Sequence, residues 1–401
     1  MNLARCTAVS IVLAAVATAC AVPTGGTGFH NGSGSSSGGA ASSGGSEPTG
    51  DTNGSTTGTF GSSSGGSSSG GGAPGTTGPV DVSAPCDSGL AIDDTNGASF
   101  AKAIGICTTA ASAGYGLVTA TYSRAFGSTS PPAAGQSGLV PQFGNAIQPR
   151  EGARIGVLST GYAGNYDAPD GLDDGENSEF VASGGGPRDG DQYPTGQAPP
   201  GFPQAAQGCP QDNRVNDMID IKLVLKAPED ATGFQFDFDF YSSEWPNYVC
   251  SNFNDAFVAY LASSAGSDNI SFDSNHNPVA VNIDFFNRCT SGAPLGCLRS
   301  NGPQPDPPLS MSSCSAGISE LTGTGFGFSD QTQCEDGNVN ATLGGATGWL
   351  QTQASVQPGE QFTLDLMIWD AGDGLLDSSV LLDHFQWIGG STVTTGTTRV
   401  Q

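Results

Sequence analysis

Residues 234–245 read Phe-Gln-Phe-Asp-Phe-Asp-Phe-Tyr-Ser-Ser-Glu-Trp, and this run is the clearest sign of the fold class in the chain. Its first seven residues alternate strictly, with a phenylalanine at every second position and Gln235, Asp237 and Asp239 between them. Successive side chains of a β-strand point to opposite faces of a sheet. The alternation therefore predicts a strand with one buried face and one polar face.

Three further segments alternate in the same way: Met218–Lys226, Val279–Phe286 and Gln361–Trp369. Turn-forming residues separate the segments at 228–230, 275–278 and 357–360. One short helix is expected, from about Ser99 to Cys107. Many strands and few helices predict a mainly β fold, a single antiparallel β-sandwich or jelly-roll-like domain with long disulfide-held loops.

The cysteines indicate an exported protein. Apart from Cys6 and Cys20, the chain has eight, and an even number allows up to four disulfides with the pairing left open. Four of the eight lie within residues 289–334, which we expect to form a loop held by these bonds. No Cys-x-x-Cys pair occurs, so the spacing does not indicate zinc. The eight are Cys86, Cys107, Cys209, Cys250, Cys289, Cys297, Cys314 and Cys334.

The first 19 residues have the pattern of a secretory signal peptide. A short segment with one positive charge precedes an apolar run that is too short to span a bilayer. The run ends in Ala17-Thr18-Ala19-Cys20, which resembles the lipobox of bacterial lipoproteins except that Ala17 stands where Leu is usual. By that resemblance Cys20 is lipidated, and Ala21 after it favours the outer membrane. The alternative is an ordinary signal peptide and a secreted protein.

Residues 20–80 are predicted to be the lipidated Cys20 followed by a disordered tether. Gly, Ser and Thr supply 43 of the 60 residues from 21 to 80, too few apolar groups to offset the entropy of ordering. Residues 81–401 remain for the folded domain. The chain has a net charge of −26, which excludes nucleic acid as a partner and favours cations.

Acidic residues gather in the segments between the predicted strands. Asp167–Asp174 and Asp370–Asp377 are similar octets in which carboxylates flank glycine. Carboxylates grouped in turns can converge on a hard cation, which needs six to eight oxygen ligands. The sequence therefore suggests structural Ca²⁺ bound by Glu244, Asp255, Asp370, Asp373 and Asp377. The alternative is that these are ordinary Asp-Gly turns with solvated carboxylates.

Two aromatic residues are candidates for ligand binding. Trp245 and Tyr248 flank Pro246 in a predicted loop, where exposed rings can stack on a sugar. A protein partner is equally compatible with them.

An enzyme is not expected, although two sets of residues in the sequence could in principle be catalytic. Glu244 and Asp370 could form a glycosidase pair, but the sequence does not give their separation. A Ser-His-Asp site could use only His276 or His384 outside the tether. Both histidines fit structural positions better.

Several blocks in order resemble the choice-of-anchor L domain of exported bacterial surface proteins. The strongest runs from Phe236 to Pro246 and continues through Phe253–Val258. Other blocks are 103–107, 116–120, 143–149, 158–161, 345–350, 358–360 and 377–385. The resemblance covers most of residues 86–390 and implies a surface module without established activity. The chain departs from the family at His384, where Asn is expected.

Taken together, these features predict a cell-surface-anchored, non-catalytic binding or structural adhesion module stabilised by Ca²⁺. Its membrane contact is the lipid anchor, and its partner is a surface glycan or protein. The alternatives are a lectin-like carbohydrate-binding domain and, further off, a glycoside hydrolase or other hydrolase.

Overall fold

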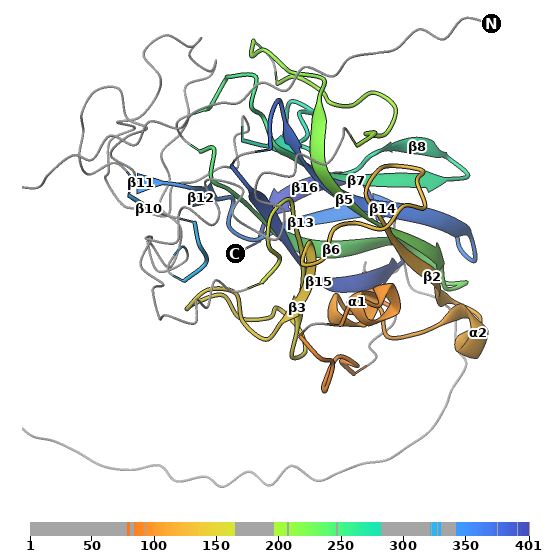
Figure 1. Ribbon diagram of the computed structural model, residues 1–401. Coiled ribbons are helices and arrows are strands. Elements are labelled where there is room, and N and C mark those ends of the chain that lie inside the picture. Colours follow the sequence, from red (N-terminus) through yellow and green to blue (C-terminus); the bar gives the residue numbers. More distant parts are fainter. Residues whose placement is uncertain are drawn as a thin grey trace, which may run out of the picture. The chain divides into compact units, whose positions relative to one another are not determined.

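Two antiparallel β-sheets packed face to face form the main part of the described fold (Figure 1). The computed structural model describes residues 78–80, 84–92, 94–164, 196–206, 208–245, 248–281, 321, 323–326, 328–329, 342–374, 376–390 and 392–400. The chain divides into residues 1–69, all outside these ranges, and residues 70–401, which contain every element named below. The mainly β, sandwich-like fold predicted from the alternating segments is confirmed.

The first sheet has eight strands, ordered β16–β13–β6–β15–β4–β3, with β12 paired to β6 and β1 paired to β15. At its centre the long strands β6 and β15 run antiparallel. Its strands are β1 (Gly78–Pro79), β3 (Ser137–Val140), β4 (Ile155–Ser159), β6 (Ala231–Ser242), β12 (Gly345–Ala346), β13 (Leu350–Ser355), β15 (Ser378–Gly389) and β16 (Gly396–Arg399).

The second sheet has six strands, ordered β2–β5–β14–β7–β8, with β9 paired to β7. Its strands are β2 (Gly116–Ser123), β5 (Val215–Lys226), β7 (Ala256–Ser263), β8 (Gly266–Asn269), β9 (Val279–Ala280) and β14 (Gln361–Ala371). A separate two-stranded sheet pairs β10 (Phe328–Ser329) with β11 (Thr342–Leu343). The strand predicted at Val279–Phe286 is described only at its start, because residues 282–286 lie outside the described ranges.

Aromatic side chains fill the space between the two sheets. Phe234 of β6 stacks on Phe362 of β14, with ring centroids 5.4 Å apart. Phe238 of β6 packs on Phe257 of β7, with centroids 4.9 Å apart. Fully burying one such side chain contributes roughly 1.5–3 kcal/mol. The alternating phenylalanines of β6 therefore hold the two sheets together.

The outer faces of the sheets are also covered, so the expectation that only one face of each strand is buried is wrong. Asp237 and Asp239, expected on that face of β6, are at most 1% exposed. A second apolar cluster covers Tyr241 and Leu381 on the first sheet, and a third covers Met367 and Trp369 on the second. The covering residues come from distant segments, such as Phe143 and Ile147 over the first sheet, so alternation within a strand could not indicate them.

Two short helices, α1 (Gly97–Ala103) and α2 (Ala110–Ala113), precede β2. The helix predicted at residues 99–107 is α1, which starts earlier because the side chain of Asn96 caps it by accepting from the Ala98 backbone N–H at 2.8 Å. It ends before Gly105, whose φ of +101° favours glycine. Phe100 of α1 is fully buried in the core between the sheets.

Two disulfides are formed within the described residues, Cys86–Cys107 and Cys209–Cys250. The first joins the segment before α1 to the segment after it. The second joins the loop before β5 to the loop between β6 and β7. The other four predicted disulfide cysteines, Cys289, Cys297, Cys314 and Cys334, lie outside the described ranges.

Candidate functional site

At one end of the sandwich, the inward-facing positions change from apolar to acidic side chains. Glu244 follows β6, Asp255 directly precedes β7, Asp370 lies near the end of β14, and Asp377 directly precedes β15. Each is at most 4% exposed. We call these four residues the inter-sheet acidic cluster, because β6 and β15 belong to the first sheet and β7 and β14 to the second.

The strand registers bring these residues together. Trp369 of β14 pairs with Ala256 of β7, so Asp370 and Asp255 occupy the next positions along the two strands. On the other sheet, Ser378 pairs with Ser242. The backbone N–H of Ser243 donates to the Asp377 carbonyl at 3.1 Å, which holds the segments carrying Glu244 and Asp377 side by side.

Asp255 links the two sheets by hydrogen bonds. Its carboxylate accepts from the backbone N–H of Ala371 at 3.0 Å and from the hydroxyl of Ser378 at 2.6 Å. Ala371 belongs to the second sheet and Ser378 to the first. One buried carboxylate therefore holds together the ends of β14 and β15.

Two other members of the cluster have oxygens without a hydrogen-bond partner among the described residues. These are both carboxylate oxygens of Asp370 and the Oε2 atom of Glu244. Thr160 lowers the pKa of Asp370, but the hydrogen bonds of its hydroxyl, each 3.4 Å long, go to the Asp377 carboxylate and the Ser378 carbonyl. Leaving a buried polar oxygen unpaired costs about 1–3 kcal/mol, and more for a charged group.

Burial and mutual repulsion make these carboxyl groups weak acids. Burial raises the pKa of Asp255 to about 7. Burial, together with the negative charge of Asp255, raises the pKa values of Glu244 and Asp370 well above their usual range. The charged groups that act on these three carboxyls are themselves acidic: other cluster members, Asp217 and Asp373. The described residues thus place several acidic groups together in an interior of low polarity.

All five carboxylates proposed from the sequence as calcium ligands lie at this end of the sandwich. Asp373 is half-buried, and its charge raises the pKa values of Glu244 and Asp255. Asp217 near the start of β5, which sequence reasoning missed, is buried and raises the pKa of Asp370. Across the described ranges, however, no three His, Cys, Asp or Glu side chains are already arranged to hold a metal ion. The other acidic octet, Asp167–Asp174, lies outside those ranges.

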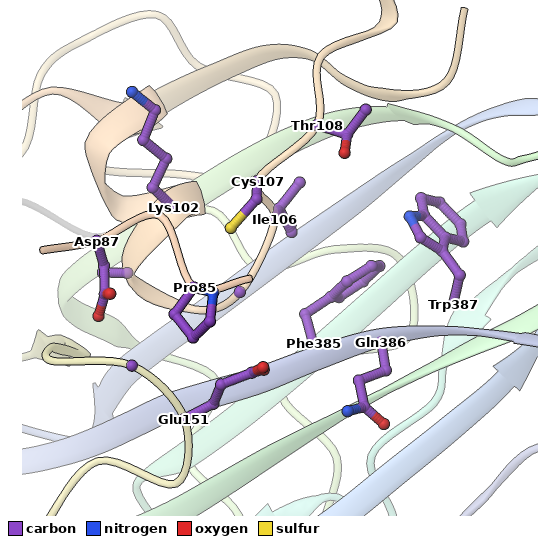
Figure 2. A pocket seen from close by; sticks show the side chains of 13 residues that line it. Pro85, Asp87, Lys102, Ile106, Cys107, Thr108, Glu151, Phe385, Gln386 and Trp387 are labelled. Atoms are coloured by element: carbon purple, nitrogen blue, oxygen red, sulfur yellow. The ribbon is translucent and has the colours of Figure 1, made fainter. Parts of the chain in front are cut away.

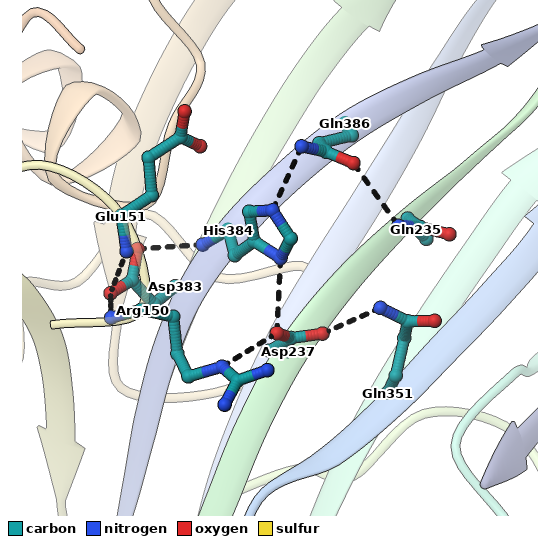
Figure 3. A network of polar contacts seen from close by, with 8 residues as sticks. All are labelled: Arg150, Glu151, Gln235, Asp237, Gln351, Asp383, His384 and Gln386. Atoms are coloured by element: carbon teal, nitrogen blue, oxygen red, sulfur yellow. Dashed lines mark hydrogen bonds and ion pairs between the residues drawn. The ribbon is translucent and has the colours of Figure 1, made fainter. Parts of the chain in front are cut away.

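His384 belongs to a separate polar network centred on Asp237 (Figure 3). Its Nδ1 atom lies 3.0 Å from Asp237, and its Nε2 atom lies 2.8 Å from the Gln386 side-chain nitrogen. Arg150 and Gln351 donate to the same Asp237 carboxylate at 3.1 and 2.8 Å. This buried carboxylate is therefore surrounded by donors, as in a structural ion pair.

The backbone of β15 explains why an unusual residue type is needed at position 384. The register with β6 shifts between Asp383 and Gln386, and His384 has a φ of +56°. Asn, Asp and His adopt this left-handed conformation more readily than other side chains. His384 and the Asn expected there by resemblance are thus both compatible with the same bulge.

Trp245 does not lie where the sequence suggested. It was expected to be exposed in a loop, but it is fully buried in the core between the sheets. Its ring cannot stack on a sugar in this conformation. Tyr248 is half-buried and packs edge-on against Phe253, with centroids 5.4 Å apart. Of the two ligand-binding candidates, only Tyr248 has an accessible surface.

Two hollows lie elsewhere on the domain. A pocket of about 160 Å³ lies between the end of α1 and β15, lined by Lys102, Glu151, Phe385 and Trp387 among others (Figure 2). A groove of about 770 Å³ lies beside β8 and is lined by Asp268, Phe272 and His276 among others. Ligand sites typically have 300–1,000 Å³, so the groove is large enough for a small ligand and the pocket is not.

The comparison with known protein families gave a match. Residues 227–386 match the model of the Choice-of-anchor L domain. This stretch is a choice-of-anchor L domain. The match covers β6, β7 and β14, nearly all of β15 and the whole inter-sheet acidic cluster. Searches of curated proteins and of solved structures gave no match.

The choice-of-anchor L match begins later than the resemblance seen in the sequence, which included blocks from residue 103 onward. In the structure, those earlier blocks lie in or near α1, β2, β3 and β4 and complete both sheets. Choice-of-anchor domains indicate an exported, surface-associated module. None of the helices within the described residues is long and apolar enough to cross a membrane.

Proposed function

We propose that this protein is a non-catalytic adhesion or structural module, held at the outer cell surface by a lipid on Cys20. The choice-of-anchor L match over residues 227–386 carries the proposal, because it indicates a surface-associated module. The lipobox-like Ala17–Cys20 and the Gly/Ser/Thr-rich stretch after it supply the means of attachment.

The burial of the candidate catalytic carboxylates supports a non-catalytic role. Glu244 and Asp370, the pair considered for glycoside hydrolysis, are each 2% exposed. A glycosidase needs both groups in contact with the sugar. Turnover of a glycan by the wild-type chain that is lost in Glu244→Gln would overturn this part of the proposal.

Lipid attachment is tested by metabolic labelling with an alkyne-tagged fatty acid in a bacterial host. Wild-type chain and Cys6→Ser are expected to carry the label, because Cys6 lies in the segment that is removed. Cys20→Ser is expected to lose the label and to leave the membrane fraction. Label retained by Cys20→Ser, or wild-type chain found unlabelled in the medium, would favour the secreted alternative.

Surface display is tested on intact cells with an added protease. We expect the protease to cleave the domain from cells that carry the wild-type chain and to leave a periplasmic marker intact. Protection of the domain until the outer membrane is permeabilised would contradict display at the surface.

The strong negative charge of the chain argues against nucleic acid as a partner.

A carbohydrate ligand is the second candidate, and the groove beside β8 favours it. Phe272 and His276 pack against each other there with ring centroids 4.5 Å apart and ring planes tilted by 33°, and the exposed Asp268 lines the same groove. Aromatic faces beside carboxylates suit sugar rings and their hydroxyls. A glycan array with the wild-type chain and Phe272→Ala tests it. A glycan bound equally by both forms would place the site elsewhere, and Tyr248→Ala would then be examined.

A further inference from the structure

We propose that the inter-sheet acidic cluster binds one divalent, oxygen-preferring cation of the Ca²⁺ type, which links the two sheets at one end of the sandwich. The proposal goes beyond surface display and does not depend on how the chain is anchored. It rests on where Glu244, Asp255, Asp370 and Asp377 lie, on their burial, and on oxygens of Asp370 and Glu244 that lack partners.

The four carboxylates of the cluster come from both sheets. Glu244 and Asp377 flank strands of the first sheet, whereas Asp255 and Asp370 come from strands of the second. Beyond Phe240, Phe257 and Ile368, the next core layer would be expected to contain apolar side chains, yet acidic ones occupy it. A cation at this level would take ligands from both sheets and so stabilise their packing.

Three buried carboxylate oxygens of the cluster lack hydrogen-bond donors among the described residues. Both oxygens of Asp370 and one of Glu244 have no hydrogen-bond donor among the described residues, and each side chain is 98% buried. Buried charges in proteins are paired or coordinate metals, because an isolated buried carboxylate is very costly. The charged groups that interact with these two carboxyls are negative, so a cation would remove repulsion as well as supply a partner.

The donor types point to Ca²⁺ and not to zinc or magnesium. The groups that surround the cluster are carboxylates and the hydroxyls of Thr160 and Ser378, which are hard oxygen donors. Ca²⁺ accepts six to eight oxygens in irregular geometry, whereas Mg²⁺ demands a near-ideal octahedron. Ligands supplied by four separate strand ends match the looser requirement.

The carboxylates are close together but are not already arranged as the ligands of one ion. Binding therefore requires the side chains of Glu244 and Asp370 to rotate toward a common point. The Asp255 carboxylate is held in place by hydrogen bonds from Ala371 and Ser378, so it is the ligand that need not move. The rival occupant is the proton: the cluster could instead stay neutral by keeping its carboxyl groups protonated.

The test is the thermal midpoint of the purified full chain, stripped of metal and measured at pH 7.5 with no addition, with Ca²⁺ or with Mg²⁺. A ligand at 100 times its dissociation constant stabilises the folded state by about 2.7 kcal/mol. That corresponds to a rise in the midpoint of roughly 5–10 °C. We expect this rise with Ca²⁺ and a smaller one with Mg²⁺.

Two variants separate the site from general binding to an acidic surface. Asp370→Asn is expected to have a higher midpoint than wild type without metal, because one buried negative charge is gone, and to lose the response to Ca²⁺. Asp230→Asn makes the same chemical change in the exposed turn before β6 and should respond as wild type does. Absence of a Ca²⁺-dependent rise in wild type, or an equal rise in Asp370→Asn, would overturn the proposal. A wild type stabilised only by acidification would assign the cluster to protons.

Discussion

Asp237 gives the most specific prediction about stability. It lies in the middle of the Phe234–Phe240 stretch, it is fully buried, and it pairs with Arg150 and His384. Asp237→Asn removes the charge and leaves Arg150, and His384 when it is protonated, facing an amide. Removing one partner of a buried ion pair costs about 3–5 kcal/mol. Because Arg150 is 30% exposed and can be hydrated, we expect the lower end, about 3 kcal/mol.

The pH dependence of this loss follows from His384. The hydrogen bond to Asp237 raises the pKa of His384 above its ordinary value of 6.5. Protonated His384 therefore stabilises the folded state fully below about pH 6.5, and this contribution is lost as pH rises through the raised pKa. Asp237→Asn should cost more at pH 6 than at pH 8.5.

Guanidinium unfolding followed by tryptophan fluorescence measures both effects. Asp230→Asn serves as the control, since an exposed substitution should change the free energy of unfolding by no more than about 0.5 kcal/mol. A loss below about 1 kcal/mol for Asp237→Asn would refute the reasoning, because the ion pair would then contribute no more than a surface contact. An equal loss at both pH values would remove His384 from the account.

Three further changes test the fold. Replacing both Cys209 and Cys250 by Ser opens a link between residues 41 apart and should lower the free energy of unfolding by about 4 kcal/mol; a loss below about 1 kcal/mol would show that the link does not constrain the unfolded chain. Phe238→Ala leaves a cavity at a fully buried position and should lower the free energy of unfolding by about 3–5 kcal/mol. Val118→Ala, at a side chain that is 41% exposed, should lower it far less. Equal losses for the two variants would contradict the assigned core. Burial raises the pKa of Asp365 to about 6 from 3.8, so stability should fall by about 3 kcal/mol as pH rises from below 4 to above 6, and Asp365→Asn should abolish that fall. Parallel pH profiles of wild type and Asp365→Asn would show that Asp365 titrates normally.

Alternation along the chain predicted the elements whose inner faces form the core. The strands β5, β6 and β14 contain the predicted segments 218–226, 234–240 and 361–369. In each segment every second residue is apolar and packs between the sheets. The same signal could not show what covers the outer faces. Asp237 and Asp239 are buried by segments distant in sequence, and Trp245, in a predicted loop, is buried in the core between the sheets.

The inter-sheet acidic cluster could be predicted only in part from the sequence. Its residues lie just before or after alternating segments, where strand ends bring them together. Asp217 and Thr160 were missed because their strands were not recognised as ending at the same place. The burial of these carboxylates could not be predicted either, since an Asp-Gly turn has the same sequence whether it faces solvent or the core.

The central claim is that the inter-sheet acidic cluster is a cation site, and terbium luminescence tests it most directly. Tb³⁺ substitutes for Ca²⁺ and emits when a nearby indole transfers its excitation energy. Trp245 follows Glu244 directly and Trp369 precedes Asp370 directly, so two buried indoles adjoin the cluster. The account predicts strong tryptophan-sensitised emission from the wild-type chain, saturating near one ion per chain, displaced by Ca²⁺ and lost in Asp370→Asn. Emission that is equal in wild type and Asp370→Asn, or absent from both, would contradict it.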